Sequence, residues 1–192
     1  KLTLQEQSPV AELLDDSDPD VLLRRVSAAG RAIAYASDEA WYRVGRVTST
    51  KRSLNPVRRL RSTRPERAPL AEGVVVQDGE AVLAVDARPD RDPVLLLRAA
   101  AAAAQAGLRL SPYAVARLAS ESAPLPEPWP VAARDSLISL LGAGRAAIPV
   151  WEALDQADLI SRLIPEWKGV RSAPQRNPVH RFTVDRHLVE TA

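Results

Sequence analysis

The 192-residue sequence predicts an all-α fold, a helical bundle, with one small β-hairpin around residues 73–85. Asp-Pro and Ser-Pro pairs repeatedly precede segments whose apolar residues recur every three or four positions, and this pattern is typical of amphipathic helices and their first turns. One Asp-Gly pair, Asp78-Gly79, lies between two short runs that contain several valines. Such a pair supplies the positive φ values of a tight turn, so these runs are predicted to form the hairpin.

Two helices are expected in the N-terminal part of the chain. Ser8-Pro9 predicts the start of a short helix that continues to Leu14. Asp18-Pro19 predicts the start of a long helix that ends at about Arg46. The apolar residues of the long helix keep the helical spacing and are Val21, Leu22, Val26, Ala29, Ile33, Ala36, Ala40, Trp41 and Val44.

Residues 48–70 are predicted to form a basic connector loop. Residues 51–67 contain seven lysines and arginines, one acid and two of the prolines in this segment. We favour a solvated link between domains, because runs of like charge repel and remain exposed. The alternative is contact with nucleotide phosphates or an acidic partner through Arg58, Arg59 and Arg61. Binding of nucleic acid is disfavoured, since no aromatic side chains that could stack on bases lie among these cations.

Further helices are expected after the hairpin. All but the last begin at a proline or follow a proline-rich link, and glycines end two of them. The predicted helices cover residues 93–106, 112–120 and 131–141, followed by helical segments from 149 and from 159. A stiff, extended link over residues 124–130 carries Trp129, and all four tryptophans are interpreted as core residues.

The composition excludes several classes of site. The chain has no cysteine, so disulfides and thiolate zinc sites are excluded. It has no apolar run of about 20 residues, the length needed to span a membrane, and we expect a cytoplasmic protein with no membrane partner. The net charge of +2 is too small to indicate a nucleic-acid partner. Because methionine is absent as well, we expect an internal piece of a longer chain.

The C-terminal stretch carries the most specific pattern. Thr183 is predicted to cap a helix, and Asp185 lies in its first turn, where the helix dipole favours a carboxylate. His187 follows about one turn into the helix. The string His-Arg-Phe-Thr-Val-Asp-Arg-His-Leu-Val-Glu-Thr at residues 180–191 resembles the opening of the HD phosphohydrolase domain in bacterial bifunctional protein-PII uridylyltransferase/uridylyl-removing enzymes, particularly those of actinobacteria. The alternative for a lone histidine is a packed or surface residue.

Residues 69–75, 125–130, 151–156, 163–167 and 177–180 are similar to the helical region that joins the two catalytic domains in that family. The resemblance implies four segments. They are a helical segment at 1–47 that continues from an upstream nucleotidyltransferase domain, the basic connector loop at 48–70, a helical linker domain with the hairpin at 71–176, and the first turns of a truncated HD domain at 177–192.

The resemblance also implies candidate roles for residues. His187 matches the first metal ligand of the HD site, while His180 and Asp185 are candidates to support that ligand. The parent enzyme would use Mg²⁺ or Mn²⁺, act on the PII signalling protein and UTP, respond to glutamine, and regulate nitrogen assimilation.

We expect this chain alone to be inactive and to bind no metal, because it contains no His-Asp dipeptide. Its Asp-x-Asp triplets at 16–18, 18–20 and 90–92 each lie beside a proline that starts a helix, and they are interpreted as helix caps rather than magnesium ligands. The alternative function is a non-catalytic helical module that binds an acidic partner through residues 51–67.

Overall fold

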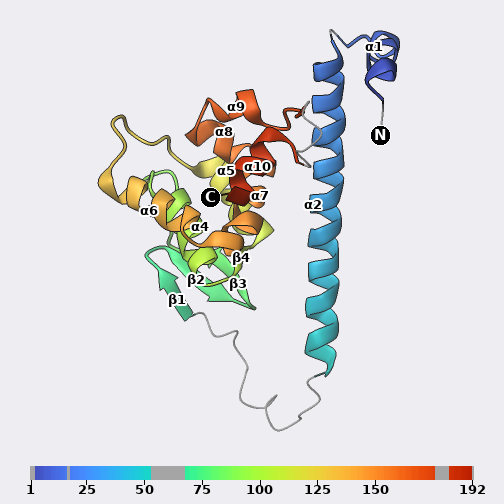
Figure 1. The fold of residues 1–192 in the computed structure, drawn as a ribbon. Coiled ribbons are helices and arrows are strands. Elements are labelled where there is room, and N and C mark those ends of the chain that lie inside the picture. Colours follow the sequence, from blue (N-terminus) through green and yellow to red (C-terminus); the bar gives the residue numbers. More distant parts are fainter. Residues whose placement is uncertain (1–2, 17, 53–67, 176–181, 192) are drawn as a thin grey trace. The chain divides into compact units, whose positions relative to one another are not determined.

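The computed structural model describes residues 3–16, 18–52, 68–175 and 182–191 (Figure 1). The chain divides into two compact units. The first, which we call the terminal unit, takes its residues from both ends of the chain, 1–46 and 166–191. The second, the central unit, comprises Val47–Pro165.

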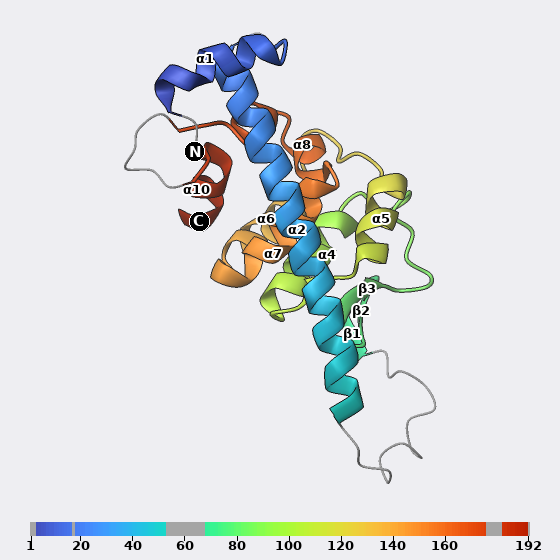
Figure 2. The ribbon, with the colours of Figure 1, turned by 90° about the vertical axis from the view of Figure 1, so that its right-hand side faces the viewer.

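The terminal unit contains α1 (Leu4–Leu13), most of α2 (Pro19–Arg52), α9 (Trp167–Val170) and α10 (Val184–Thr191). Figure 2 shows α2 as one unbroken helix. Its predicted start is confirmed, because Asp18 Oδ1 accepts hydrogen bonds from the backbone N–H of Asp20 (2.7 Å) and of Val21 (3.0 Å). The carboxylate thereby satisfies two N–H groups that have no partner within the helix.

The predicted start of the first helix at Ser8-Pro9 is wrong, since α1 already begins at Leu4 and contains Pro9 in its interior. Thr3 and Glu6 provide an earlier start: the Glu6 carboxylate accepts from the backbone N–H and the hydroxyl of Thr3, both at 2.8 Å. A Thr-x-x-Glu capping box of this kind satisfies the first helical donors. It therefore outweighs the start signal of the Ser-Pro pair.

Regular structure occupies both edges of the predicted connector at 48–70. Helix α2 continues to Arg52, and strand β1 begins at Ala68. No glycine or proline lies between Arg46 and Arg52, so nothing in the sequence stops the helix where it was predicted to end. The remainder of the basic segment, including Arg58, Arg59 and Arg61, lies outside the described residues.

The predicted hairpin is confirmed in the central unit. Strands β2 (Val74–Gln77) and β3 (Glu80–Leu83) pair antiparallel across Asp78 and Gly79, whose φ angles are 53° and 78°. The sheet is larger than one hairpin, however. It has four strands in the order β1-β2-β3-β4 and is mixed, because β1 (Ala68–Ala71) pairs antiparallel with β2 and β4 (Arg109–Leu110) pairs parallel with β3.

The two extra strands could not be found from periodicity. Strand β4 has two residues and β1 has four, and neither is long enough to show a clear alternation of apolar and polar side chains. Both strands are stabilised by pairing with the hairpin, which would be marginal alone. The fold is therefore mostly helical, as predicted, with a small mixed sheet in place of a single hairpin.

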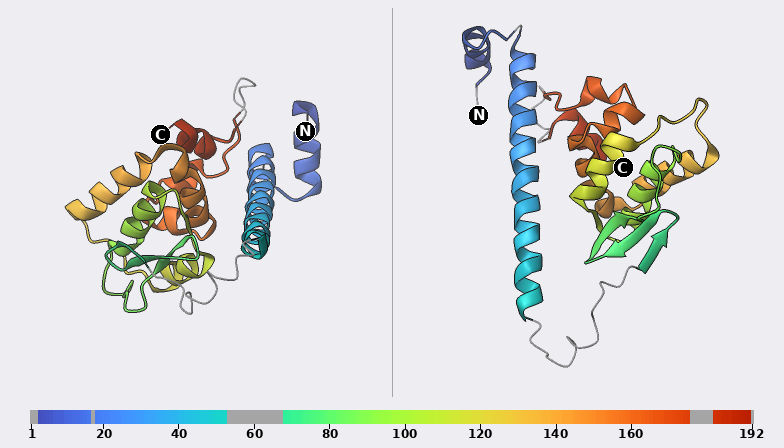
Figure 3. Two further views of the ribbon diagram at one scale, coloured as in Figure 1. Left: turned by 90° about the horizontal axis from the view of Figure 1, so that it is seen from below. Right: turned by 180° about the vertical axis from the view of Figure 1, so that it is seen from behind.

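Five α-helices of the central unit follow the predicted order: α4 (Leu95–Gln105), α5 (Pro112–Glu121), α6 (Val131–Leu141), α7 (Ala147–Gln156) and α8 (Leu159–Leu163), with a short 3₁₀ turn at Gly144–Ala146. Helix α4 packs against α6, α7 and strands β1, β3 and β4. Figure 3 shows the sheet at one side of these helices. Most of the α4 alanines are buried, and their small side chains allow this close packing.

The core of the central unit is aliphatic. Its fully buried side chains include Leu95, Leu97, Leu118, Leu140, Leu154, Leu159 and Ile160. Two of the four tryptophans are buried as predicted, Trp151 in the central unit and Trp167 in the terminal unit. Trp41 is 71% exposed and contradicts the prediction, because it lies on a face of α2 that also exposes Val44 and Ile33.

No single helix among the described residues is both long and apolar enough to cross a membrane. Helices α6 and α7, with the turn between them, satisfy the length and composition only as a pair, and they are bent by 106° at the break.

Candidate functional site

The candidate site lies on α10, whose existence at the predicted position is confirmed. The helix begins at Val184, and the backbone N–H of His187 donates to the carbonyl of Thr183 at 2.9 Å, which closes the first turn. The N–H of Arg186 donates to Asp185 Oδ1 at 2.9 Å. The acidic side chain in the first turn thus accepts one of the N–H groups that the helix leaves without a partner.

Asp185 is far more buried than a helix-capping residue needs to be, with only 1% of its surface exposed. Its Oδ2 accepts from the guanidinium of Arg31 at 2.7 Å and from the backbone N–H of Ser172 at 2.8 Å. All three residues belong to the terminal unit. The carboxylate therefore connects α2, the turn after α9 and the first turn of α10.

The sequence could place Asp185 in the first turn but could not identify its partners. Arg31 lies 154 positions earlier in the chain, on a helix with several arginines. A buried carboxylate needs a cation or several donors, because transfer of an unpaired charge out of water is strongly unfavourable. The only sequence signal for this pair was an acidic residue in the first turn of the predicted helix, directly after the apolar Val184.

His187 is half-buried and lies two residues after Asp185. Among residues 3–16, 18–52, 68–175 and 182–191, no group of three or more His, Cys, Asp or Glu side chains could hold a metal ion. The described residues therefore do not form a metal site around His187, and no metal-dependent step can be derived from them. His180, the second candidate, lies outside the described residues.

The acidic triplets make contacts other than metal ligation. Asp18 caps α2 as predicted. Asp92 does not cap α4, which begins at Leu95 and has no side-chain cap hydrogen bond; its carboxylate accepts from the N–H of Val94 at 3.2 Å and pairs with Arg98 at 2.7 Å. Asp90 instead accepts from Arg88 at 3.0 Å, and this guanidinium lowers the pKa of the Asp90 carboxyl. The interpretation as a helix cap is therefore confirmed for Asp18, whereas Asp90 and Asp92 form ion pairs with nearby arginines.

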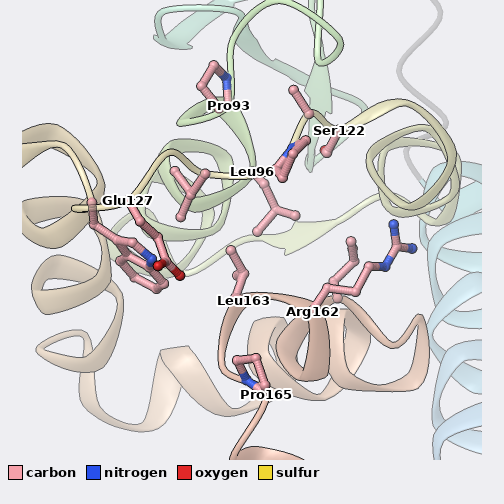
Figure 4. Close-up of a pocket in the computed structure, with 12 residues that line it drawn as sticks. Pro93, Leu96, Ser122, Glu127, Arg162, Leu163 and Pro165 are labelled. Carbon is pink, nitrogen blue, oxygen red and sulfur yellow. The ribbon is translucent and has the colours of Figure 1, made fainter.

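The central unit contains a pocket that the sequence did not indicate (Figure 4). Its volume is about 420 Å³, within the range of roughly 300–1,000 Å³ that is common for small-molecule sites. The lining is largely apolar and combines prolines, leucines and Trp129. The residues are Pro93, Leu96, Ser122, Ala123, Pro124, Leu125, Glu127, Trp129, Leu159, Arg162, Leu163 and Pro165.

The polar groups of the pocket are few. Figure 4 shows Glu127 and Arg162 on opposite sides of the apolar lining. One nitrogen of Arg162 donates to the carbonyl of Ala119 at 2.7 Å, and the buried Ser122 hydroxyl has no hydrogen-bond partner among the described residues. The segment predicted as a stiff link, residues 124–130, supplies several of the lining residues. The prolines and Trp129 of this segment are the sequence features that could have indicated the pocket.

The chain resembles segments of much longer proteins. It is 58% identical over its whole length to the bifunctional uridylyltransferase/uridylyl-removing enzyme of Streptomyces coelicolor, and the match covers 24% of that protein. It is 43% identical over its whole length to the enzyme of the same name from Mycobacterium tuberculosis, covering 23%. The Corynebacterium glutamicum enzyme is 37% identical over 65% of this chain. The chain thus spans about a quarter of the length of the first two relatives.

No protein-family model matches the chain. No solved structure matches it either.

Proposed function

We propose that this chain, which matches a segment of the actinobacterial bifunctional uridylyltransferase/uridylyl-removing enzymes over its whole length, forms the helical region that joins the two halves of such an enzyme. The 58% identity across the whole chain supports the proposal, because it extends the resemblance of residues 180–191 to all other segments. In this proposal residues 1–47 follow a nucleotidyltransferase domain, residues 71–176 form the linker domain, and residues 177–192 begin the HD domain.

The parent enzyme would transfer UMP from UTP to the PII signalling protein and would hydrolyse it again, under control of glutamine. A bound Mg²⁺ or Mn²⁺ would polarise the phosphate and lower the pKa of an attacking water. His187 would contribute one imidazole to that site. Its helix is anchored through Asp185, which supports a fixed placement of the ring, whereas the remaining ligands would come from outside this chain.

The test is His187→Ala in the full-length enzyme. We expect removal of UMP from uridylylated PII to fall by more than about 100-fold, since loss of a residue that merely supports a metal ligand already costs about 10–100-fold. UTP-dependent transfer should keep its rate, because it would use a separate site. A matched control is Glu190→Ala, which removes a partly exposed carboxylate from the same helix and breaks only its pair with Arg186. Unimpaired UMP removal in His187→Ala would contradict the proposal.

The chain by itself should be inactive in both reactions, because the described residues offer no complete set of metal-binding side chains. Incubation of the isolated chain with PII and UTP, and separately with uridylylated PII, should give blank rates. The alternative role, an interaction module that binds an acidic partner through residues 51–67, stays a prediction. Most of that segment lies outside the described residues.

A further inference from the structure

An arginine near the start of the chain is bonded to the helix that carries the candidate histidine. Arg31 lies on α2, and its guanidinium is 2.7 Å from Asp185 Oδ2 on α10. Only 17% of the Arg31 side chain and 1% of the Asp185 side chain are exposed. Water therefore screens this pair much less than it screens an ion pair at the surface.

The same carboxylate accepts hydrogen bonds from three separate parts of the terminal unit. Oδ2 accepts from Arg31 and from the Ser172 N–H, while Oδ1 accepts from the Arg186 N–H. The Val184 N–H also donates to the carbonyl of Ala173 at 3.0 Å. Each of these contacts lies in the first turn of α10, immediately before His187.

Helix α10 depends on these contacts. It has eight residues, and an isolated helix shorter than about 12–15 residues is marginal in water. Within the described residues, Arg31 is the one cationic side chain bonded to the buried carboxylate. If Arg31 were removed, Asp185 would have to move towards water, because a buried carboxylate without its cation is strongly unfavourable.

We propose that Arg31 is a positioning residue for His187: through Asp185 it fixes the first turn of α10, so that the placement of the histidine depends on α2. The inference rests on the proposed function. In the parent enzyme, α2 would follow the transferase domain and α10 would begin the hydrolytic domain. The ion pair would then connect the two halves directly, without passing through the central unit.

Arg24 offers a matched control. It lies two turns before Arg31 on the same helix and donates to the carbonyls of Lys168 and Gly169, both at 3.0 Å. Arg24→Ala would therefore remove an α2 contact of the same unit and leave Asp185 fully bonded. Arg31→Lys is the conservative variant, since it keeps a cation but loses the planar guanidinium.

The experiment compares full-length enzymes carrying Arg31→Ala, Arg31→Lys or Arg24→Ala. Hydrogen exchange of the peptide that covers residues 184–191 reports the anchoring of α10. For Arg31→Ala we expect exchange to speed up about tenfold or more, because this helix opens locally when its anchor is lost. The kcat of UMP removal should fall by a similar factor with little change in KM, while UTP-dependent transfer stays within about twofold of wild type.

Arg31→Lys should recover part of both effects, and Arg24→Ala should leave α10 exchange and UMP removal close to wild type. The proposal is overturned if Arg31→Ala leaves α10 exchange unchanged, or if Arg24→Ala exposes α10 equally. It is also overturned, with the proposed function intact, if UMP removal is lost in His187→Ala but unchanged in Arg31→Ala. If His187→Ala itself retains UMP removal, the proposed function fails and the positioning role fails with it.

Discussion

The interactions that stabilise the central unit differ from those that stabilise the terminal unit. The central unit has a continuous aliphatic core, in which Leu118, Leu140 and Leu154 are completely buried. In the terminal unit the described buried apolar residues are few, and they include Leu22 and Trp167. Its contacts between distant parts of the chain include the hydrogen bonds of Arg24 and the pair of Arg31 with Asp185. Burial of apolar area stabilises the central unit, whereas a small number of directional bonds specifies the terminal unit.

The largest effect should come from breaking the buried pair in the terminal unit. Arg31→Met leaves the Asp185 carboxylate without its cation, which should destabilise this unit by about 3–5 kcal/mol. The double variant Arg31→Met/Asp185→Leu removes both charges and should recover part of that loss, since an apolar pair of similar size often replaces an ion pair at little cost. Recovery should be incomplete, because the buried Ser172 N–H loses its acceptor. Chemical unfolding, monitored by hydrogen exchange in each unit, measures the stability of the single and the double variant. Equal destabilisation by the single and double variants would mean that charge does not govern this contact.

The corresponding change in the central unit is Leu154→Ala. Leu154 is completely buried on α7, and a cavity at such a site typically costs about 2–5 kcal/mol. Leu13→Ala is the control, because Leu13 is 83% exposed and its truncation should have a small effect. Denaturant unfolding monitored in the central unit tests this. If Leu154→Ala weakened the terminal unit as strongly as the central one, the units would unfold together.

The same contrast explains which features the sequence predicted. The helices and the hairpin of the central unit follow from local signals: Ser111 caps α5, Asp78-Gly79 makes the turn, and apolar spacing marks the buried faces. Strands β1 and β4 were missed, since their pairing depends on residues brought together by the fold. The terminal unit depends on contacts across 144 or more positions, and a charge pattern along one helix does not reveal which arginine meets which carbonyl or carboxylate.

In the candidate site, too, local sequence predicted some features and contacts between distant residues decided others. Residues 180–191 gave the helix, the position of His187 and the resemblance that the comparisons confirm. This stretch did not indicate that Asp185 is buried, because its partner Arg31 is distant in sequence. The pocket lined by Trp129 and Arg162 was missed for the opposite reason. Its residues come from several elements that each looked like core or linker when taken alone.

A smaller effect is expected at the helix caps, where both units use the same chemistry. Asp18 caps α2 in the terminal unit, and the Ser111 hydroxyl accepts from the Ala114 N–H at 3.1 Å in the central unit. Replacement of either residue by alanine should cost about 1 kcal/mol, the usual value for loss of such a cap. Thermal unfolding and local hydrogen exchange would show whether each loss stays within its own unit. A much larger loss for Asp18→Ala would indicate that the terminal unit depends on its first turn.

The smallest effect concerns two exposed carboxylates, one in each unit. Two hydrogen bonds from Thr3 lower the pKa of Glu6 in the terminal unit, and the bond from the backbone N–H contributes more than the bond from the hydroxyl. The hydrogen bond from the Arg88 side chain lowers the pKa of Asp90 in the central unit. A carboxyl whose pKa is lower in the folded protein contributes stability above its unfolded pKa. That contribution is lost as pH falls through the folded pKa.

The two groups should respond differently to substitution. Thr3→Ala removes only the hydroxyl, so the pKa of Glu6 should stay below its ordinary value through the backbone donor. Arg88→Ala removes both the donor and the charge, so the pKa of Asp90 should return to its ordinary range. Added salt should raise the pKa of Asp90 more than that of Glu6, because Asp90 is also stabilised by the charge of Arg88. NMR titrations of the Glu6 and Asp90 carboxyls, in the wild type and in each variant, at low and high salt, measure these pKa changes. A complete return of Glu6 to its ordinary pKa in Thr3→Ala would show that the hydroxyl, rather than the backbone, holds its charge.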